Sequence, residues 1–213
     1  SLLEMNSQAD AAIIEAGISR VGEMDLLEKM IQPTIGILTS IGSAHRDNFD
    51  SPNEQLTEKL ILFRNTGKVF YHETIQLEEI PAHFQSIKTK EYASLLETIN
   101  FDDEISRINA SMAIACAKEF DLNEDEIKEQ LGELDRVALR LETFDGIHNS
   151  IIINDTYNLD LDAFRSSLEY QLSIAKGKDR VAIVGTDGDT SKIEALLSEF
   201  EPIQVHFLDS AEK

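Results

Sequence analysis

The sequence predicts an α/β protein with a mostly parallel sheet, and two observations lead to this fold class. Short apolar runs bounded by turn residues alternate along the chain with longer segments whose apolar residues recur at helical spacing. Strands that alternate with helices are typical of parallel sheets covered by helices. The pattern changes near Gly146, which predicts two domains, residues 1–145 and residues 146–213.

The first predicted domain begins with alternating strands and helices. Strands are expected at residues 11–17, 34–41 and 68–71, and helices at residues 23–31 and 53–63. Pro33 ends the first helix, and the run Asp50-Ser-Pro-Asn53 is a start signal for the second. Short strands or loops are expected at residues 72–104, followed by a helical hairpin of residues 105–120 and 123–134.

The second predicted domain is a β-α-β-α-β unit, the beginning of a small doubly wound fold. Its strands are expected at residues 150–155, 180–185 and 203–208, and its helices at residues 160–172 and 190–200. The pattern looks cut at both ends of the chain. We therefore expect a piece of a longer polypeptide.

The chain is strongly acidic, with 40 Asp and Glu residues against 19 Lys and Arg residues and a formal net charge of −21. Such a surface repels phosphate backbones and anionic lipid, so no nucleic-acid partner is expected. Cys116 is the only cysteine, which excludes a disulfide within the chain and a cysteine-rich zinc site. No apolar run approaches the roughly 18 residues of a membrane span. No signal-peptide pattern is present, and a cytoplasmic location is expected.

The first candidate site lies where two predicted strands end. Glu15 closes the first strand, and His45 follows the second. If the strands are neighbours, oxygen and nitrogen donors on one rim could hold a divalent cation. The alternative is that Glu15 caps a turn and His45 is a polar loop residue. Lys59 is expected in the first turns of a helix, where a cation is disfavoured and an anionic carbamate would suit a nearby metal, although surface lysines are common.

Other candidate residues lie on a helix and around the domain joint. Asn109 interrupts an apolar helix, where it either binds something specific or serves as a capping or surface residue. Arg140 can clamp a phosphate with its planar guanidinium, or form a salt bridge with Glu142. Asp155 and Tyr157 follow a strand, where ligands are usually bound, although such turns also arise for local reasons. The sequence contains no Gly-x-x-x-x-Gly-Lys-[Ser/Thr] phosphate loop.

Taken together, these motifs resemble those of the Mur ligases. The matching runs, in the order of the family, include Ile14-Glu-Ala-Gly-Ile-Ser19, Ile41-Gly-Ser-Ala-His45, Glu58-Lys-Leu-Ile-Leu-Phe63, Asn109-Ala110, Val137–Glu142 and Ile153-Asn-Asp-Thr-Tyr-Asn158. The family couples ATP hydrolysis to amide-bond formation in peptidoglycan precursor synthesis. The resemblance implies part of the family's central ATPase domain, followed by part of a Rossmann-like C-terminal domain.

The resemblance also implies roles for the candidate residues, with ATP and Mg²⁺ as cofactors. Glu15 and His45 would be magnesium ligands. Lys59 would be carbamylated and support the metal, so that His45 and Lys59 serve catalysis.

The remaining candidates would form the nucleotide site. Asn109 would contact adenine, and Arg140 and Asp155 would contact the nucleotide from the joint between the domains. Tyr157 and Asn158 would line the same cleft.

Within the family, the sequence is most similar to ligases that add D-alanyl-D-alanine to UDP-N-acetylmuramoyl-tripeptide through an acyl phosphate, including those fused to an alanine racemase. Ser40 and Leu159 depart from the family pattern, and the family's phosphate loop is expected upstream of residue 1. The piece alone is therefore expected to be inactive. The alternatives are another Mur-type or folylpolyglutamate-type ligase, or a non-catalytic scaffold module.

Overall fold

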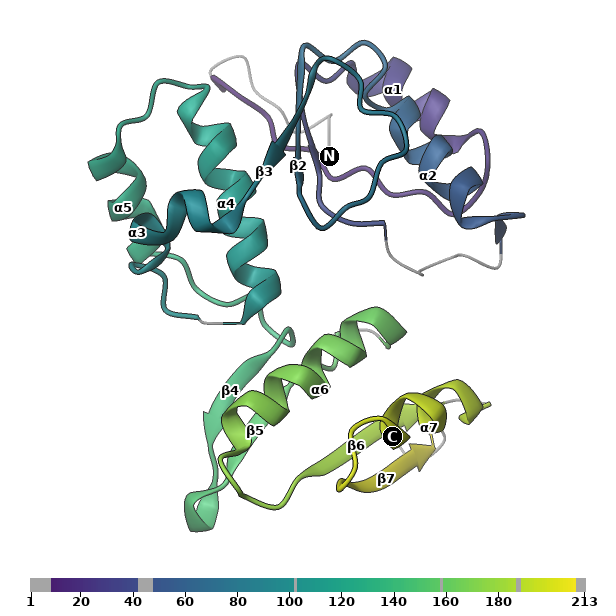
Figure 1. Ribbon diagram of the computed structural model, residues 1–213, viewed down its shortest axis with the longest axis vertical. Helices are drawn as coiled ribbons and strands as arrows, with labels where there is room; N and C mark the ends of the chain where they lie inside the picture. Colours follow the sequence, from purple (N-terminus) through teal and green to yellow (C-terminus); the bar gives the residue numbers. More distant parts are fainter. Residues whose placement is uncertain (1–8, 42–47, 102, 158, 187–188, 210–213) are drawn as a thin grey trace. The chain divides into compact units, whose positions relative to one another are not determined.

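The computed structural model describes residues 9–41, 48–101, 103–157, 159–186 and 189–209 (Figure 1). The chain forms two compact units. The first extends to Ala93 and also includes Ile108–Asn123, and the second comprises Ser94–Arg107 and the residues from Glu124 onward. The domain boundary near residue 145 remains a prediction.

The first unit is built on a parallel sheet of three strands in the order β1-β2-β3 (Figure 1). The strands are β1 (Ile35–Leu38), β2 (Lys68–His72) and β3 (Phe84–Ile87). Helix α1 (Glu23–Ile31) precedes β1, α2 (Pro52–Ile61) joins β1 to β2, and α4 (Glu104–Lys118) follows β3 after the short helices η3 (Thr89–Tyr92) and α3 (Ala93–Leu96). This alternation confirms the predicted α/β class with a parallel sheet.

Helices cover both faces of this sheet because side chains alternate along β2. Phe70 faces α4, where it packs with Met112 and Ala115. Its neighbours Val69 and Tyr71 face the opposite side, where they pack with Phe63 just after α2. Helix α2 begins as the sequence predicts: Ser51 is the N-cap, its hydroxyl accepts a hydrogen bond from the amide of Glu54, and Pro52 occupies the first turn.

The described residues of the second unit form two separate pairs of strands. The antiparallel pair is β4 (Glu142–Asp145) and β5 (Ile151–Asn154), linked through η4 (Ile147–Asn149). The parallel pair is β6 (Val181–Thr186) and β7 (Gln204–Asp209). The helices of this unit are α5 (Glu124–Gly132), α6 (Leu161–Ala175) and α7 (Ser191–Ser198). The core of the parallel pair is formed by Leu168 of α6, Ala182 and Val184 of β6, and Ile193, Leu196 and Leu197 of α7.

Two predictions about strands are wrong. Residues 11–17 are described but do not form a strand, and Ile13 is fully exposed. The sheet that the described residues form consists of β1, β2 and β3, and this apolar run is not paired with any of them. The predicted β-α-β-α-β unit also differs, because β5 pairs with β4 rather than with β6. The short connection from Asp145 to Ile151 favours a local antiparallel pair.

In the part of the chain that the structure describes, none of the helices combines the length and apolar character needed to cross a membrane.

Candidate functional site

The most distinctive feature among the candidate residues is a contact between Arg140 and Tyr157. The guanidinium carbon of Arg140 lies 4.2 Å from the centroid of the Tyr157 ring, which is within the range of a cation–π interaction. Both side chains are exposed, Tyr157 by 60%. A cation–π contact uses the face of the guanidinium and leaves its in-plane N–H groups available for an anion. Tyr157 follows the carboxyl end of β5, and Arg140 precedes β4, the strand that pairs with β5.

The backbone that carries Arg140 is held in an unusual conformation. Leu139 and Leu141, on either side of it, have φ angles of 62° and 49°. This left-handed region is disfavoured for residues with a Cβ atom, at a cost of roughly 1–2 kcal/mol each. Three hydrogen bonds offset the cost: the amide of Leu139 donates to Glu142 Oε2 at 2.8 Å, its carbonyl accepts from the amide of Tyr157 at 3.1 Å, and the amide of Leu141 donates to Asp155 Oδ1 at 3.3 Å.

Asp155 therefore anchors the turn as well as lying at the end of a strand. Its Oδ1 accepts from Leu141, and its Oδ2 accepts from the hydroxyl of Ser167 on α6. Ser167 is buried, and no sequence pattern distinguishes it from the other polar residues of an amphipathic helix. Glu142 accepts from Leu139 and from the side-chain amide of Asn154 at 3.1 Å. Glu142 thus supports the turn that presents Arg140. From the sequence, Glu142 was considered only as a salt-bridge partner of Arg140.

Lys59 does not lie in the first turns of its helix, as predicted, but in the last turn of α2. The helix spans Pro52–Ile61 and ends two residues before the predicted Phe63, so the ammonium lies at the end where a cation is favoured. Lys59 is half-buried, its Nζ donates to the carbonyl of Ser40 at 3.3 Å, and burial lowers its pKa. A lowered pKa increases the neutral amine fraction, which is the form that reacts with carbon dioxide.

The residue before Lys59 has a role that the sequence did not reveal. Glu58 is buried, and its Oε1 accepts hydrogen bonds from the amides of Gly22 at 2.7 Å and Met24 at 3.1 Å. These amides lie at the start of α1, where N–H groups lack partners within the helix. The carboxylate therefore caps α1 and fastens it to α2.

The other predicted residues are not brought together by the described chain. Glu15 is exposed in an extended segment, and Asn109 is exposed on α4. His45 and Asn158 lie outside the described residues. Within the described ranges, no group of three or more His, Cys, Asp and Glu side chains could hold a metal ion.

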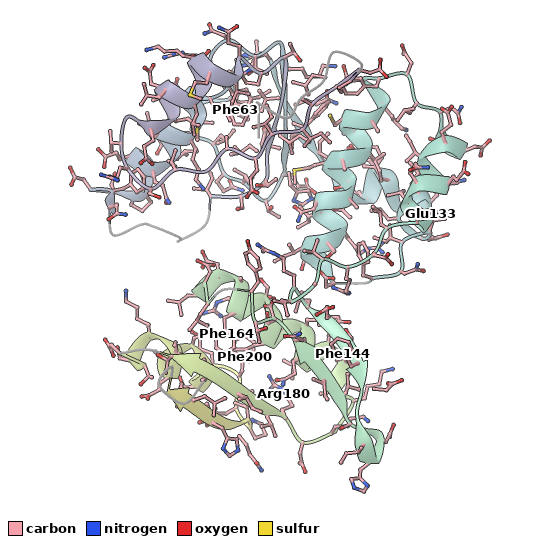
Figure 2. All side chains as sticks on the ribbon, turned by 180° about the vertical axis from the view of Figure 1, so that it is seen from behind. Phe63, Glu133, Phe144, Phe164, Arg180 and Phe200 are labelled. Carbon is pink, nitrogen blue, oxygen red and sulfur yellow. The ribbon has the colours of Figure 1, made fainter. Side chains whose placement is uncertain are left out.

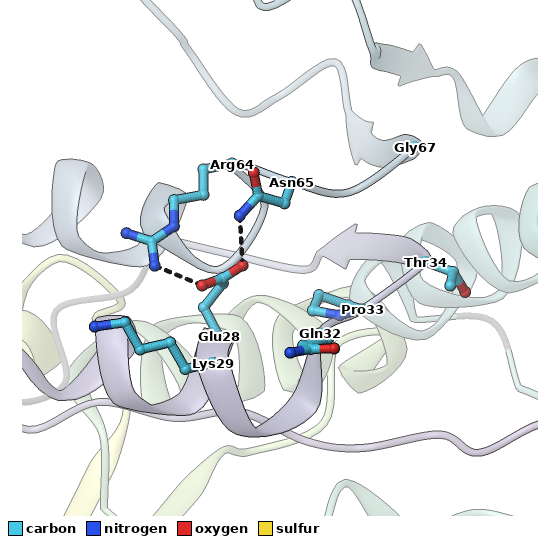
Figure 3. Close-up of a pocket in the computed structure, with 8 residues that line it drawn as sticks. All are labelled: Glu28, Lys29, Gln32, Pro33, Thr34, Arg64, Asn65 and Gly67. Carbon is cyan, nitrogen blue, oxygen red and sulfur yellow. Dashed lines mark hydrogen bonds and ion pairs between the residues drawn. The ribbon is translucent and has the colours of Figure 1, made fainter.

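A cavity of about 630 Å³ lies at the amino-terminal end of the first sheet, where the chain leads into β1 and β2 (Figure 3). Three of its polar side chains, Glu28, Arg64 and Asn65, are bonded to one another. Glu28 is only 4% exposed, and its carboxylate accepts from Arg64 Nη2 at 2.5 Å and from Asn65 Nδ2 at 2.8 Å. The hydrogen bond from Asn65, followed by that from Arg64, lowers the pKa of Glu28. This cluster holds α1 against the segment after α2.

Fold and site together define an α/β protein whose candidate ligand-binding residues follow the ends of strands. Among solved structures, the chain is similar to MurF from Acinetobacter baumannii, with a TM-score of 0.76 and 20% identity over 99% of this chain and 58% of that chain. At this identity the likeness shows the fold. Residues 1–122 match the model of the Mur ligase middle domain, and the chain belongs to the Mur ligase family.

Two curated relatives bear the name UDP-N-acetylmuramoyl-tripeptide–D-alanyl-D-alanine ligase. The protein of Bacillus subtilis (strain 168) is 22% identical over 214 residues, and that of Borreliella burgdorferi is 25% identical over 215 residues. Each alignment covers 87% of this chain and 46% of the relative. The chain thus spans about half the length of the curated relatives it matches.

Proposed function

We propose that this chain is the central part of an ATP-dependent ligase that adds D-alanyl-D-alanine to UDP-N-acetylmuramoyl-tripeptide in cytoplasmic peptidoglycan synthesis. Membership of the Mur ligase family supports the reaction class, and the names of the relatives support these substrates. The proposal concerns the ligase and does not extend to a fused racemase.

The observation that carries the proposal is the ordered turn that presents Arg140 on the ring of Tyr157. Two strained leucine conformations persist there because Glu142 and Asp155 hold the backbone. Strain of this kind concentrates at ligand sites, where the surrounding structure maintains one geometry. A guanidinium held in this way donates to phosphate oxygens without first losing side-chain freedom.

In the proposed reaction, the tripeptide carboxylate attacks the γ-phosphorus of ATP, and ADP leaves. The amine of D-alanyl-D-alanine then attacks the acyl phosphate, and inorganic phosphate leaves as the amide bond forms. Arg140 and Asp155 contact the nucleotide, Tyr157 and Asn158 line its site, and Asn109 contacts adenine. Arg140 would offset negative charge on the phosphates, a large contribution in phosphoryl transfer.

Magnesium would neutralise charge on the phosphates, and we propose Glu15, His45 and carbamylated Lys59 as its site. The carboxylate oxygen of Glu15 suits a hard cation. The lowered pKa of Lys59 favours the amine that a carbamate requires. Glu15 and Lys59 lie within the described residues and His45 outside them, and the described residues contain no other group of three or more His, Cys, Asp and Glu side chains that could hold the ion.

The test uses the full-length polypeptide that contains this chain. Phosphate release is measured with ATP, UDP-N-acetylmuramoyl-tripeptide and D-alanyl-D-alanine, and with each substrate omitted in turn. We expect release to require all three and Arg140→Ala to lower kcat/KM by roughly tenfold or more, since charged hydrogen bonds contribute about 1.5–3 kcal/mol. Arg165→Ala is the matched control, because this exposed arginine also lies over an aromatic ring, Phe200.

Two further outcomes separate the alternatives. Release that depends on another amino acid or on a folate would assign a different ligase reaction. A well-folded parent that releases no phosphate with any of these substrates would instead indicate a scaffold.

His45→Ala tests the metal proposal, since an unchanged magnesium requirement would contradict ligation by this residue.

A further inference from the structure

Arg140 lies in an irregular segment between α5 and β4 in which a single side chain turns inward. From Gly132 to Arg140, Arg136 is the only residue that is not exposed. Glu133, near the start of the segment, is exposed beside the end of α5 (Figure 2). The larger apolar residues of the segment are exposed as well, namely Leu134, Val137 and Leu139. A charged side chain therefore occupies the inward position that an apolar residue usually takes.

The guanidinium of Arg136 lies against two aromatic rings and a carboxylate. Its central carbon is 5.3 Å from the ring centroid of Phe101 and 5.6 Å from that of Tyr170, both within the range of a cation–π interaction. Its Nη1 lies 2.8 Å from Oδ2 of Asp103, an ion pair without the alignment of a hydrogen bond. The side chains of this pair are 18% and 4% exposed, so solvent screens it only weakly.

The partners of Arg136 belong to two helical elements of the second unit. Asp103 directly precedes α4, and its Oδ1 accepts a hydrogen bond at 2.8 Å from the amide three residues on, as an N-cap does. Tyr170 lies on α6 one turn after Ser167, whose hydroxyl bonds Asp155. Arg136 therefore fastens the exposed segment to the start of α4 and to the helix that also holds Asp155.

A backbone hydrogen bond extends this attachment to Arg140. The amide of Arg140 donates to the carbonyl of Val137, the residue after Arg136, at 3.1 Å. Because this bond closes one turn between the two arginines, fixing Arg136 restricts where Arg140 can lie. The turn is thus held on both sides, by Arg136 before it and by Asp155 after it.

We propose that Arg136 is a positioning residue for Arg140. It holds the segment so that the guanidinium of Arg140 lies on the ring of Tyr157 before a nucleotide binds, and it acts through Arg140 rather than by touching the nucleotide. The catalytic consequence rests on the proposed function, whereas the geometry can be measured without any activity.

The first test measures that geometry by NMR in the full-length polypeptide, isotope-labelled at its arginines. The ring of Tyr157 shifts the resonance of the Arg140 Nε–H group, which is assigned by its loss in Arg140→Ala. Arg136→Lys keeps the charge but removes the planar guanidinium. We expect it to move the Arg140 resonance towards its position in the Tyr157→Leu variant.

Arg165→Lys is the matched control and should leave the Arg140 resonance in place. Arg165 also forms an ion pair, with Glu199, and also lies over a ring, 5.8 Å from the centroid of Phe200. Both of these partners lie outside the segment that carries Arg140.

The second test is a mutant cycle measured as kcat/KM for ATP. Arg136→Lys should lower kcat/KM by roughly threefold or more, and by no more than Arg140→Ala does. In the Arg140→Ala background the same substitution should have no further effect, because a residue that acts only through Arg140 has nothing left to position.

Two results would overturn the proposal and make Arg136 a purely structural residue: an unmoved Arg140 resonance in folded Arg136→Lys, or an equal loss of kcat/KM in both backgrounds. If Arg136→Lys does not fold, Tyr170→Leu removes one ring and keeps the ion pair, and an unmoved resonance there would overturn the proposal as well. A parent that releases no phosphate would refute the ligase reaction alone, because the resonance still tests the position of Arg140.

Discussion

Replacing Gly36 by alanine should destabilise the first unit, because the new methyl group has no space. A Cβ atom at this position of β1 would lie 2.5 Å from two ring carbons of Phe63 and 3.3 Å from Val69 Cγ2. Carbon atoms prefer separations of about 3.5–4.0 Å, so the ring would have to move by about 1 Å. Phe63 is buried and packs edge-on against Phe84 at 6.0 Å between centroids, which restricts that movement.

The expected loss follows from two opposing terms. Overpacking a core costs about 1–3 kcal/mol. Alanine also lowers the conformational entropy of the unfolded chain relative to glycine, which stabilises the folded state by about 0.4–1 kcal/mol and offsets part of this cost. We therefore expect Gly36→Ala to lower the free energy of unfolding by about 1–2 kcal/mol. Gly185→Ala in β6 is the control, since no atom of the described residues lies within 4 Å of its Cβ position, and it should raise the free energy of unfolding by about 0.4–1 kcal/mol.

The assay is urea unfolding followed by circular dichroism. Amide hydrogen exchange of β1 serves to assign the transition, because two units can unfold separately. Phe63→Val removes both clashing atoms, Cδ1 and Cε1, so Gly36→Ala should cost less in that background than in the wild type. An equal cost in both backgrounds would refute the argument from steric overlap, as would a loss with Gly185→Ala of the same size.

Three further predictions concern polar groups. Ser167→Ala removes the hydroxyl that donates to Asp155 and should lower the stability of the second unit by about 1 kcal/mol, measured by urea unfolding; no change would mean that the bond contributes nothing. Arg165 lowers the pKa of Glu199 from its ordinary 4.5, so the stability that this pair contributes is full above that pH and is lost as pH falls through the lower folded pKa. Arg165→Met should therefore lower the urea midpoint of unfolding at neutral pH, and the midpoint should approach that of the wild type in acid. A difference between the two proteins that does not depend on pH would contradict this. Burial lowers the pKa of Lys59, so its labelling by an amine-reactive reagent, followed by mass spectrometry, should reach half its maximal rate below pH 10.5, and a midpoint at or above that value would disprove it.

The elements with strong local signals could be predicted from the sequence. Met24, Leu27 and Ile31 recur at helical spacing before Pro33, and α1 has the predicted bounds, Glu23–Ile31. The Ser51-Pro52 start of α2 could be recognised because a cap acts through neighbouring residues. The strand predicted at 11–17 is absent, because a strand requires a partner that the local sequence does not specify.

The sequence by itself determined the alternation of strands and helices, the candidate residues Arg140, Asp155 and Tyr157, and the resemblance to a family. Only the tertiary structure decided which groups support them. Ser167 bonds Asp155 across 12 positions of the chain, and Glu58 reaches the start of α1 across 34 or more. Partners so distant are set by how helices pack on strands, and no periodicity or motif records them. The buried position of Glu28 beside Arg64 and Asn65 is the same kind of feature, because these residues lie 36 and 37 positions apart in the sequence.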